Sequence, residues 1–324
     1  MRVLITGVTG FVGGHLAERL LREGGHDIAG VARRPDWPEH WRHLAGSVAL
    51  HAVDWDSAAT LVRLLGRLRP DWVFHLAGYA HNGHSFHDAD ATWAGNLQTT
   101  RTLYDAIARW GGTPRILFAS TGLVYGEPDG PEALFDERSP LKPASPYAAS
   151  KAAADLLSYQ AVRHPGLDIV RVRAFNHTGP KQSTHYVAPN FARQIAGIQI
   201  GKLPPVVETG DLSGRRDLTD VRDMVRAYVL LLQRGERAEV YNAASGQAYR
   251  IEEILNRLIA LAGVRVEVRQ TIDPDRRGET AVSRGDFSKL RQATGWAPEF
   301  TLDQTLADML ADWRQRHGRL RAGA

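Results

Sequence analysis

The chain of 324 residues contains no cysteine and only five lysines. Without thiols it can form no disulfide and no thiolate nucleophile, and nothing in its composition points outside the reducing cytoplasm. No apolar run reaches the roughly 20 residues of a membrane-spanning helix, and no basic and then apolar secretion signal precedes the first expected strand. We therefore expect a cytoplasmic protein with no membrane partner.

A strong excess of one charge is also missing, because 40 basic residues are balanced by 36 acidic ones for a net charge of +4. The basic residues are scattered rather than gathered into a stripe, which argues against a nucleic-acid partner. Most of them are arginines, whose planar fork suits the phosphates of small ligands. The length allows one large hydrophobic core or two smaller ones.

Tyr147 and Lys151 stand four residues apart in Ser-Pro-Tyr-Ala-Ala-Ser-Lys, and this spacing places them on one face of a helix. Ser145 can serve as N-cap, and Pro146 suits the first helical turn. A lysine cation next to a phenol stabilises the phenolate, which we expect to lower the pKa of Tyr147 towards the range useful for acid–base catalysis. A solvated Tyr/Lys pair is the bland alternative for these two residues alone.

The apolar run 2–6 leads into Gly7, Gly10 and Gly13, spaced Gly-x-x-Gly-x-x-Gly, and then into an amphipathic helix. A strand, a glycine turn and a helix N-terminus together form the start of a dinucleotide-binding unit. A second strand, 27–32, ends at Arg33 and Arg34 with no acid. Arginine at this position accommodates the 2′-phosphate of NADP, whereas two merely solvated arginines are the competing interpretation.

Strand-like runs alternate with helical patterns, such as 58–68 and 92–110, as far as about residue 175. This alternation predicts an α/β fold with a Rossmann-type, doubly wound parallel sheet. Beyond Asn176 the pattern changes to loops and shorter helical segments, including 187–200 and 251–262.

Several motifs together carry a family resemblance over essentially the whole chain. They are Gly7-x-x-Gly10-x-x-Gly13, Leu76-Ala77-Gly78, Asn96, Ser120-Thr121 with Tyr125-Gly126, Tyr147-x-x-x-Lys151, Asn176-His177-Thr178-Gly179-Pro180, Arg215-Arg216-Asp217, Tyr241-Asn242 and Arg276-x-x-Glu279. The chain resembles the nucleotide-sugar branch of the extended short-chain dehydrogenase/reductase family. Within that branch it is most similar to GDP-4-keto-6-deoxy-mannose reductases and their relatives, the GDP-mannose 4,6-dehydratases.

The resemblance implies a catalytic set of Thr121, Tyr147 and Lys151, with Ser120 a weaker candidate for the first position. Tyr147 would handle the proton of the sugar oxygen, Lys151 would hold the nicotinamide ribose, and the Thr121 hydroxyl would hydrogen-bond the oxygen. Dehydratases of this branch carry an acid at one or both of the next two positions, where this chain has Gly122 and Leu123. We therefore predict that it does not dehydrate GDP-mannose.

The same resemblance implies the ligand sites. NADP(H) is expected rather than NAD(H), bound by Gly7, Thr9, Gly10, Phe11, Val12, Gly13, Arg33, Asp54, Trp55, Leu76, Ala77, Gly78, Asn96, Tyr147 and Lys151. The nucleotide sugar, expected to be GDP-linked, would be bound by Ser85, Asn176, Arg216, Arg276 and Glu279. A salt bridge of Arg216 with Asp217 or Asp220 is an equal alternative for that residue. No metal is expected from the histidines at 75, 81, 84 and 87.

The resemblance also implies a division of the chain. Residues 1–175 and about 212–243 would form the NADP-binding domain, and 176–211 and 244–324 a lobe for the nucleotide sugar. A homodimer would form through two helices around 92–110 and 147–164. The implied activity is NADPH-dependent reduction of the 4-keto group of a GDP-linked 4-keto-6-deoxy hexose. A nucleotide-sugar 4-epimerase with retained NAD stays open as an alternative, as does a non-catalytic NADP-binding regulator.

Overall fold

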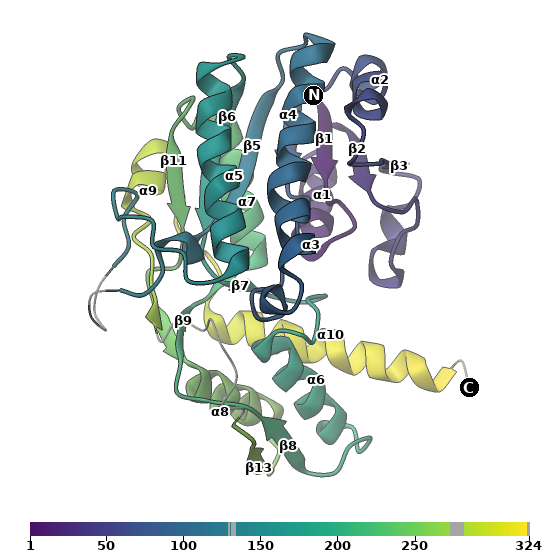
Figure 1. The fold of residues 1–324 in the computed structure, drawn as a ribbon. Helices are drawn as coiled ribbons and strands as arrows, with labels where there is room; N and C mark the ends of the chain where they lie inside the picture. The colour runs from purple at the N-terminus through teal and green to yellow at the C-terminus, as the bar shows by residue number, and fades with distance from the viewer. Residues whose placement is uncertain (129, 131–133, 273–281, 323–324) are drawn as a thin grey trace.

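The computed structural model describes residues 1–128, 130, 134–272 and 282–322. Its centre is a seven-stranded sheet in the order β3-β2-β1-β4-β5-β6-β11, in which every neighbouring pair is parallel (Figure 1). The strands of this sheet are β1 (Arg2–Thr6), β2 (Asp27–Ala32), β3 (Ala49–Ala52), β4 (Trp72–His75), β5 (Arg115–Thr121), β6 (Asp168–Ala174) and β11 (Val240–Ala243). This confirms the expected doubly wound Rossmann-type fold.

Helices cover both faces of the sheet, as a parallel sheet buried on both sides requires. One face packs against α1 (Phe11–Glu23) and α7 (Val221–Arg234), and the other against α2 (Ala58–Leu68), α4 (Thr99–Trp110) and α5 (Pro146–Arg163). The short helices are η1 (Glu39–Leu44), η2 (Gly83–Phe86), α3 (Ala89–Trp93), η3 (Ala94–Gln98) and η4 (Gly122–Tyr125). Among them, η3 is a π-helix.

A smaller lobe lies beyond the carboxyl ends of the strands (Figure 1). Its core is formed by α6 (Val187–Gln199), α8 (Ile251–Ala262) and α10 (Leu302–Ala322), whose apolar faces pack together. Short strands complete it in three small sheets: β7 (His177–Thr178) with β10 (Thr219–Asp220), β8 (Val206–Thr209) with β13 (Glu267–Gln270), and β9 (Arg215–Asp217) between β12 (Ala248–Arg250) and β14 (Val282–Ser283).

One segment differs from the expected division of the chain. The range 244–324 was assigned to the lobe as a whole, but α9 (Ser288–Thr294) and Trp296 pack with α7 in the core on one face of the large sheet. The Trp296 indole donates a hydrogen bond of 3.0 Å to the Asp223 carbonyl of α7. The chain therefore crosses back to the large sheet before α10 returns to the lobe. No helix in the described ranges is both long and apolar enough to cross a bilayer.

Candidate active site

The start of α5 holds the pair predicted from the sequence. Ser145 is the N-cap, and its hydroxyl accepts a hydrogen bond of 3.1 Å from the Ala148 amide, while Pro146 occupies the first turn. A helix capped in this way begins at a defined residue. It places Tyr147 and Lys151 one turn apart beside the carboxyl end of β5.

Thr121 ends β5 and meets Tyr147 there. Its hydroxyl oxygen accepts a hydrogen bond of 3.3 Å from the Leu123 amide in η4, and its side chain lies close enough to the Tyr147 phenol to favour the ionised form of that phenol. The Leu123 amide uses a lone pair of Thr121 and not its hydroxyl proton, which can be donated to an oxygen in the site. Two hydroxyl groups therefore converge at the point where a carbonyl oxygen could be polarised.

Lys151 is buried behind this pair, with 9% of its surface exposed. Its ammonium donates to the Ala119 carbonyl and lies 4.7 Å from the centre of the Phe118 ring. Burial lowers the pKa of Lys151 to about 8, and the carboxylate of Asp155, one turn further along α5, opposes this shift. The side chain is thus a cation at neutral pH that loses its charge within the range of ordinary assays.

The expected effect of Lys151 on Tyr147 was wrong. Burial raises the pKa of the Tyr147 phenol, and the nearby Thr121 hydroxyl opposes the rise. The lysine cation is directed to the Ala119 carbonyl instead of lowering that pKa. In this state the phenol holds its proton firmly, which suits a group that donates a proton rather than one that accepts it.

Ser85 has a different place from the one expected. Its side chain is fully buried. Its hydroxyl donates a hydrogen bond of 2.6 Å to the Asn82 carbonyl, and the hydroxyl oxygen accepts a hydrogen bond of 3.2 Å from the Tyr147 amide. Both bonds lie within the protein, so the structure favours a role in anchoring the start of α5. Direct contact of Ser85 with sugar hydroxyls stays a prediction that these contacts do not support.

Asn96 also ties protein segments together. Its side-chain oxygen accepts 2.9 Å from the Tyr79 amide, and its amide nitrogen donates 2.9 Å to the Ser150 hydroxyl. Ser150 donates in turn 2.9 Å to the Tyr147 carbonyl. Asn96 lies in the π-helical turn η3, a distortion that is frequent at functional sites. It connects the loop after β4 with the helix that carries Tyr147.

The glycine turn is shaped for a phosphate group. Gly7 has φ +73°, and a Cβ there would lie 2.9 Å from the Ala77 amide nitrogen. A Cβ on Gly13 would lie 2.3 Å from the Gly7 carbonyl oxygen, so no larger residue fits. Among the described residues, no side chain caps α1 at Gly10 and no acid stands in its first turn. Its N–H groups are therefore suited to an anion, and the cradle fits the pyrophosphate of a dinucleotide.

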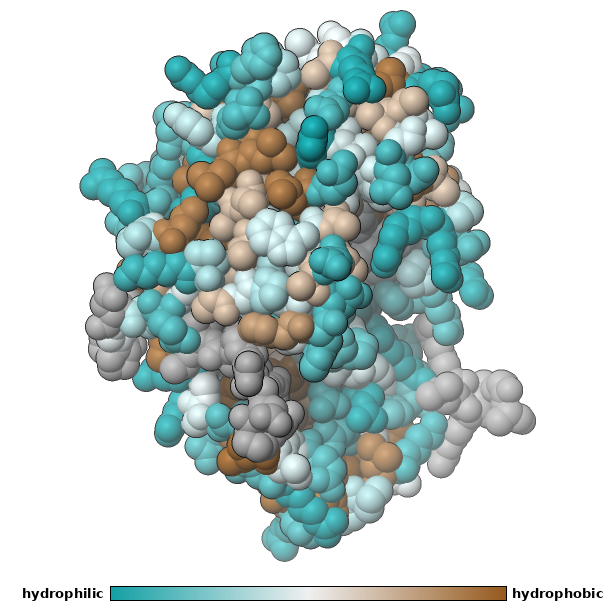
Figure 2. Space-filling model, viewed as in Figure 1, coloured by the Kyte–Doolittle hydropathy of each residue, from teal (hydrophilic) through white to brown (hydrophobic). Residues whose placement is uncertain are grey.

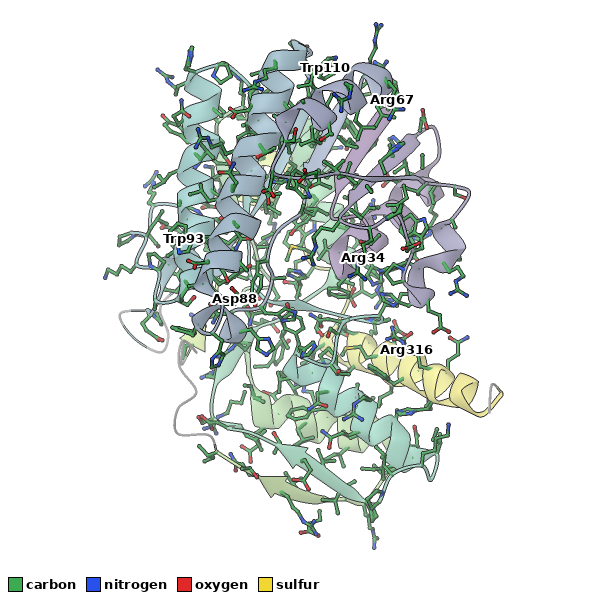
Figure 3. All side chains as sticks on the ribbon, turned by 45° about the vertical axis from the view of Figure 1, so that its right-hand side comes forward. Arg34, Arg67, Asp88, Trp93, Trp110 and Arg316 are labelled. Atoms are coloured by element: carbon green, nitrogen blue, oxygen red, sulfur yellow. The ribbon has the colours of Figure 1, made fainter. Side chains whose placement is uncertain are left out.

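The remaining cofactor candidates surround this turn. Thr9, Phe11, Val12, Leu76 and Ala77 are partly buried, whereas Gly78 and Arg33 are exposed. Figure 3 shows Arg34 at the edge of the large sheet that faces α10 and its Arg316. After β3, the Asp54 carboxylate accepts a hydrogen bond of 3.0 Å from the Asp56 amide. Trp55 packs against the core between the sheet and the helices α2, α4 and α5. These residues follow the carboxyl ends of neighbouring strands, where dinucleotides bind in such folds.

On the lobe side, the loop after β6 adjoins the glycine turn. The Asn176 carbonyl accepts 3.0 Å from the Thr219 amide, and the ring of His177 stacks on Phe11 with centres 6.1 Å apart. Asn176 is therefore held next to the proposed cofactor cradle. Arg276 and Glu279, the other nucleotide candidates, lie outside the described residues.

Arg216 does not use the carboxylates that were its alternative partners. The Asp217 carboxylate accepts hydrogen bonds of 2.7 Å from the Ser245 amide and 2.9 Å from the Gly246 amide. Asp220 forms a salt bridge of 2.7 Å with Arg222. The guanidinium of Arg216 donates 2.9 Å to the Arg215 carbonyl. Arg216 has further partners besides this carbonyl, and a phosphate contact of its guanidinium stays a prediction.

Tyr186 is a residue of the site that the sequence did not suggest. It is the N-cap of α6 in the lobe. Its hydroxyl donates a hydrogen bond of 2.9 Å to the Ala80 carbonyl in the loop after β4. Burial and then the nearby Tyr147 raise the pKa of the Tyr186 phenol, which places the two phenols within electrostatic reach. No local motif marks this tyrosine, because only the packing of the lobe brings it to Tyr147.

Three imidazoles gather next to Tyr186. The ring centres of His81, His84 and His185 are 5.2–5.7 Å apart, and His81 also stacks on Tyr186 at 5.4 Å. Burial lowers the pKa of His81, and the two neighbouring histidines lower it further. Within the described ranges no group of three or more His, Asp or Glu side chains is arranged to hold a metal ion. The lowered pKa of His81 favours its neutral imidazole, which can hydrogen-bond a polar ligand.

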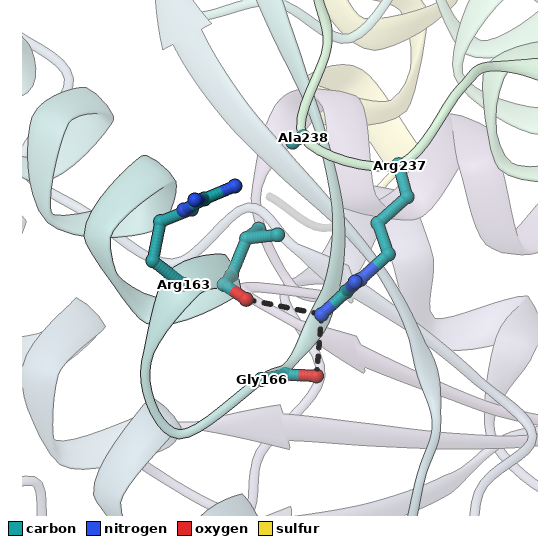
Figure 4. Close-up of a pocket in the computed structure, with 5 residues that line it drawn as sticks. Arg163, Gly166, Arg237 and Ala238 are labelled. Atoms are coloured by element: carbon teal, nitrogen blue, oxygen red, sulfur yellow. Dashed lines mark hydrogen bonds between the residues drawn. The ribbon is translucent and has the colours of Figure 1, made fainter.

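A surface cavity of about 460 Å³ lies elsewhere, between the end of α5 and the turn before β11 (Figure 4). Its lining includes Arg237, whose guanidinium donates to the carbonyls of Val162 at 3.0 Å and Gly166 at 2.8 Å. These bonds tie the loop after α5 to the segment before β11. The cavity is at the amino-terminal edge of the sheet, away from Tyr147.

Comparison with known proteins gives consistent matches over nearly the whole chain. The model of the GDP-mannose 4,6 dehydratase family matches residues 4–309. The GDP-6-deoxy-D-mannose reductase of Pseudomonas aeruginosa is 35% identical, over 97% of this chain and 98% of that protein. The solved structure of RMD from Pseudomonas aeruginosa complexed with NADPH superposes with a TM-score of 0.83 at 35% identity, covering 97% and 99% of the two chains. The UDP-glucose 4-epimerase of Thermus thermophilus, in complex with NAD, gives a TM-score of 0.86 at 30% identity, covering 97% and 99%.

Proposed function

Because the chain belongs to the GDP-mannose 4,6-dehydratase family of extended short-chain dehydrogenases/reductases, we propose that it is an NADPH-dependent reductase. Its substrate is a GDP-linked 4-keto-6-deoxy hexose, and its product is of the GDP-6-deoxy-D-mannose type. The similar Pseudomonas aeruginosa reductase, named for this product, supports that substrate class.

The observation that carries the proposal is that the side chains of Thr121 and Tyr147 come together beside the buried cation of Lys151. NADPH supplies a hydride when it is bound. The chain must then polarise the keto oxygen and provide a proton to it. Thr121 can donate its hydroxyl proton to that oxygen. Burial raises the pKa of the Tyr147 phenol, which therefore keeps its proton until the reaction.

The next two positions argue against dehydration. Gly122 and Leu123 have no group that can move a proton. A Cβ on Gly122 would lie 2.9 Å from the ring of Phe175, so even a short acidic side chain would displace a buried aromatic residue. Elimination of water from the sugar therefore lacks its acid in this chain, although the matching family model is named for a dehydratase.

The cofactor is NADP(H), as in the similar reductase structure complexed with NADPH. We assign the 2′-phosphate to the exposed Arg33 at the end of β2. Replacing Arg33 by Ala should weaken NADPH binding by about tenfold or more and leave NADH binding within about twofold, since a charge-assisted phosphate contact is worth roughly 1.5–3 kcal/mol. Equal weakening of both nucleotides would remove this assignment.

Turnover of a panel of nucleotide-linked 4-keto-6-deoxy sugars, followed by NADPH absorbance, tests the activity. Tyr147→Phe should lose at least about a hundredfold in kcat, the range of a general acid, and still bind NADPH. Tyr159→Phe, on the same helix, is the matched control, because it keeps the aromatic ring that we place at the dimer contact and loses only a hydroxyl group; it should keep full activity. A Tyr147→Phe protein with normal turnover would exclude this phenol as the acid.

A nucleotide-sugar 4-epimerase is the second candidate, favoured by the similarity to an epimerase in complex with NAD. An epimerase regenerates its cofactor in each cycle and keeps it bound. Purified protein that carries tightly bound NAD and consumes no NADPH would support this alternative. Free exchange of NADPH with stoichiometric oxidation would reject it.

The assembly that fits the exposed surface is a homodimer formed through α4 and α5. Leu156 and Tyr159 of α5 are 59% and 46% exposed, and Trp93 before α4 is 38% exposed. Figure 2 shows hydrophobic side chains gathered over the region where Figure 1 places these helices. A second copy would cover such a patch. Light scattering should give twice the mass of the chain, and Leu156→Glu should give the monomer.

A cytoplasmic location remains a prediction from the lack of cysteine.

A further inference from the structure

His75 is the last residue of β4 and is buried at the centre of the fold, with 1% of its surface exposed. Its Nδ1 lies 2.8 Å from the hydroxyl of Thr6, the last residue of β1, and its Nε2 lies 3.0 Å from the hydroxyl of Thr100 in α4. The imidazole thus joins two strands of the sheet with a helix that covers one face.

The direction of each hydrogen bond around this ring is fixed. The single hydroxyl proton of Thr100 is donated at 2.6 Å to the Asn96 carbonyl, so its oxygen can only accept from His75. Nε2 must therefore carry the ring proton, Nδ1 must be the acceptor, and Thr6 must donate to it. This arrangement requires a neutral imidazole in one tautomer.

At one end of this series of hydrogen bonds, Thr6 holds the backbone after β4, which lines the proposed cofactor site. Its hydroxyl oxygen accepts from the amides of Leu76 at 3.2 Å and Ala77 at 3.1 Å. Gly7, which follows Thr6, packs so closely on Ala77 that a Cβ would lie 2.9 Å from its amide nitrogen. The position of the glycine turn is therefore set through Thr6.

The Thr100 end leads to the proton donor. Thr100 holds the carbonyl of Asn96, and the Asn96 side chain holds Ser150, whose hydroxyl donates to the Tyr147 carbonyl. Every contact in this series is between 2.6 and 3.0 Å. Asn96 lies in the π-helical turn η3, which packs against α5.

We propose that His75 is a positioning residue, which holds the glycine turn and the Tyr147 segment at a fixed separation through one neutral Nε2–H tautomer. The proposal rests on the reductase function above, because the separation matters only if Tyr147 works against a bound nucleotide. Burial lowers the pKa of His75 to about 3, and the Lys151 cation adds to this effect. The ring therefore stays neutral throughout the working pH range.

The test compares His75→Phe, Thr100→Val and Thr100→Ser. The first two remove the bridge from either end, and the third keeps the hydroxyl. We expect kcat, counted per NADPH-binding site, to fall by about tenfold or more in the first two, since a small misplacement has this effect on a reaction step. KM and the NADPH dissociation constant should change by less than about threefold, and Thr100→Ser should retain wild-type kcat.

Two readouts separate positioning from a merely structural role. The isotope effect with NADPH deuterated at the transferred position should rise in the slow variants, because the chemical step becomes limiting. Ring ¹⁵N NMR of the nucleotide-free protein should show His75 as the Nε2–H tautomer without titration between about pH 5 and 9. His51→Gln, in the edge strand β3, is the control and should change none of these values.

An unchanged kcat per site in both His75→Phe and Thr100→Val overturns the proposal, as does a His75 ring that titrates near its ordinary pKa. If His75→Phe fails to fold, Thr100→Val with its serine rescue decides the matter. A wild-type protein that binds NADPH but reduces none of the sugars counts against the proposed function, and the NMR titration then decides about His75 independently.

Discussion

Asp155 offers the sharpest test of how the site is supported. It lies one turn after Lys151 on α5 and is completely buried. Its two carboxylate oxygens accept hydrogen bonds from Arg171 at 2.6 Å and Arg173 at 2.9 Å, both from β6. Asp155→Asn keeps the shape of the side chain but removes the negative charge that both buried guanidinium groups share.

The expected loss follows from what each arginine keeps. Removing one partner of a buried ion pair destabilises a protein by roughly 3–5 kcal/mol. Arg171 still donates 2.8 Å to the Ala238 carbonyl, and Arg173 still donates 3.0 Å to the Tyr125 hydroxyl. We therefore expect the lower end, about 3 kcal/mol of the free energy of unfolding, or a drop of roughly 4–5 °C in Tm for a chain of this size.

Asp168→Asn is the matched control, because this carboxylate begins the same strand β6 and pairs with Arg115 at 3.2 Å near the surface. Its side chain is 34% exposed, and such a pair contributes about 0–1 kcal/mol. Urea unfolding of both variants, followed by tryptophan fluorescence at equal m-values, measures the difference. A loss for Asp155→Asn no larger than for Asp168→Asn would refute the idea that this carboxylate compensates two buried cations.

Two further predictions concern the cofactor turn and the contact between the domains. Gly13→Ala would put a Cβ 2.3 Å from a backbone carbonyl oxygen, so NADPH affinity measured by fluorescence should fall by about tenfold or more. Gly83→Ala is the control and should bind NADPH normally, because no atom lies within 4 Å of the added Cβ. Equal NADPH affinities of the two variants would contradict the role of the glycine turn in binding the cofactor. Against the effect of burial, nearby His15 and the hydrogen bond from Lys181 hold the pKa of Glu18 at about 2. This carboxylate therefore stabilises the fold above its ordinary pKa of 4.5, and the contribution disappears as the pH falls towards 2. Wild-type protein should lose about 1–2 kcal/mol more than Glu18→Gln over this range in acid unfolding, a discounted figure for a partly exposed group; parallel curves would show that Glu18 makes no such contribution.

The elements of the site that were predictable are those specified by neighbouring residues. Ser145 and Pro146 define the start of α5 through a cap and a fixed φ, so the position of Tyr147 follows from local sequence. The glycine turn after β1 and the strand–helix alternation likewise need only short-range patterns. The parallel order of the sheet then follows from the handedness of its crossovers.

The features that were missed depend on contacts between distant segments. The range 92–110 is helical throughout, as expected, but the sequence did not reveal the π-turn η3 within it, where the Thr100 hydroxyl donates a hydrogen bond to the Asn96 carbonyl. Tyr186 reaches Tyr147 only because the lobe folds against the sheet. The direction of Lys151 is decided by the Ala119 carbonyl on β5, which no spacing along α5 reveals. Propensity and period carry no information about such pairings.

The raised pKa of Tyr147 leads to a last prediction, about the direction of the reaction. Reduction of a ketone by NADPH consumes one proton, so the ratio of forward to reverse rate constants must change tenfold per pH unit. If Tyr147 keeps its proton, the forward kcat/KM is independent of pH below about 8, and it falls above that value as Lys151 loses its charge. The whole tenfold change per unit then belongs to oxidation of the product, which needs the scarce phenolate and should accelerate with rising pH. Initial rates in both directions between about pH 6 and 8 measure this, and a forward rate that rises tenfold per unit towards acid would mean that Tyr147 is already ionised at neutral pH.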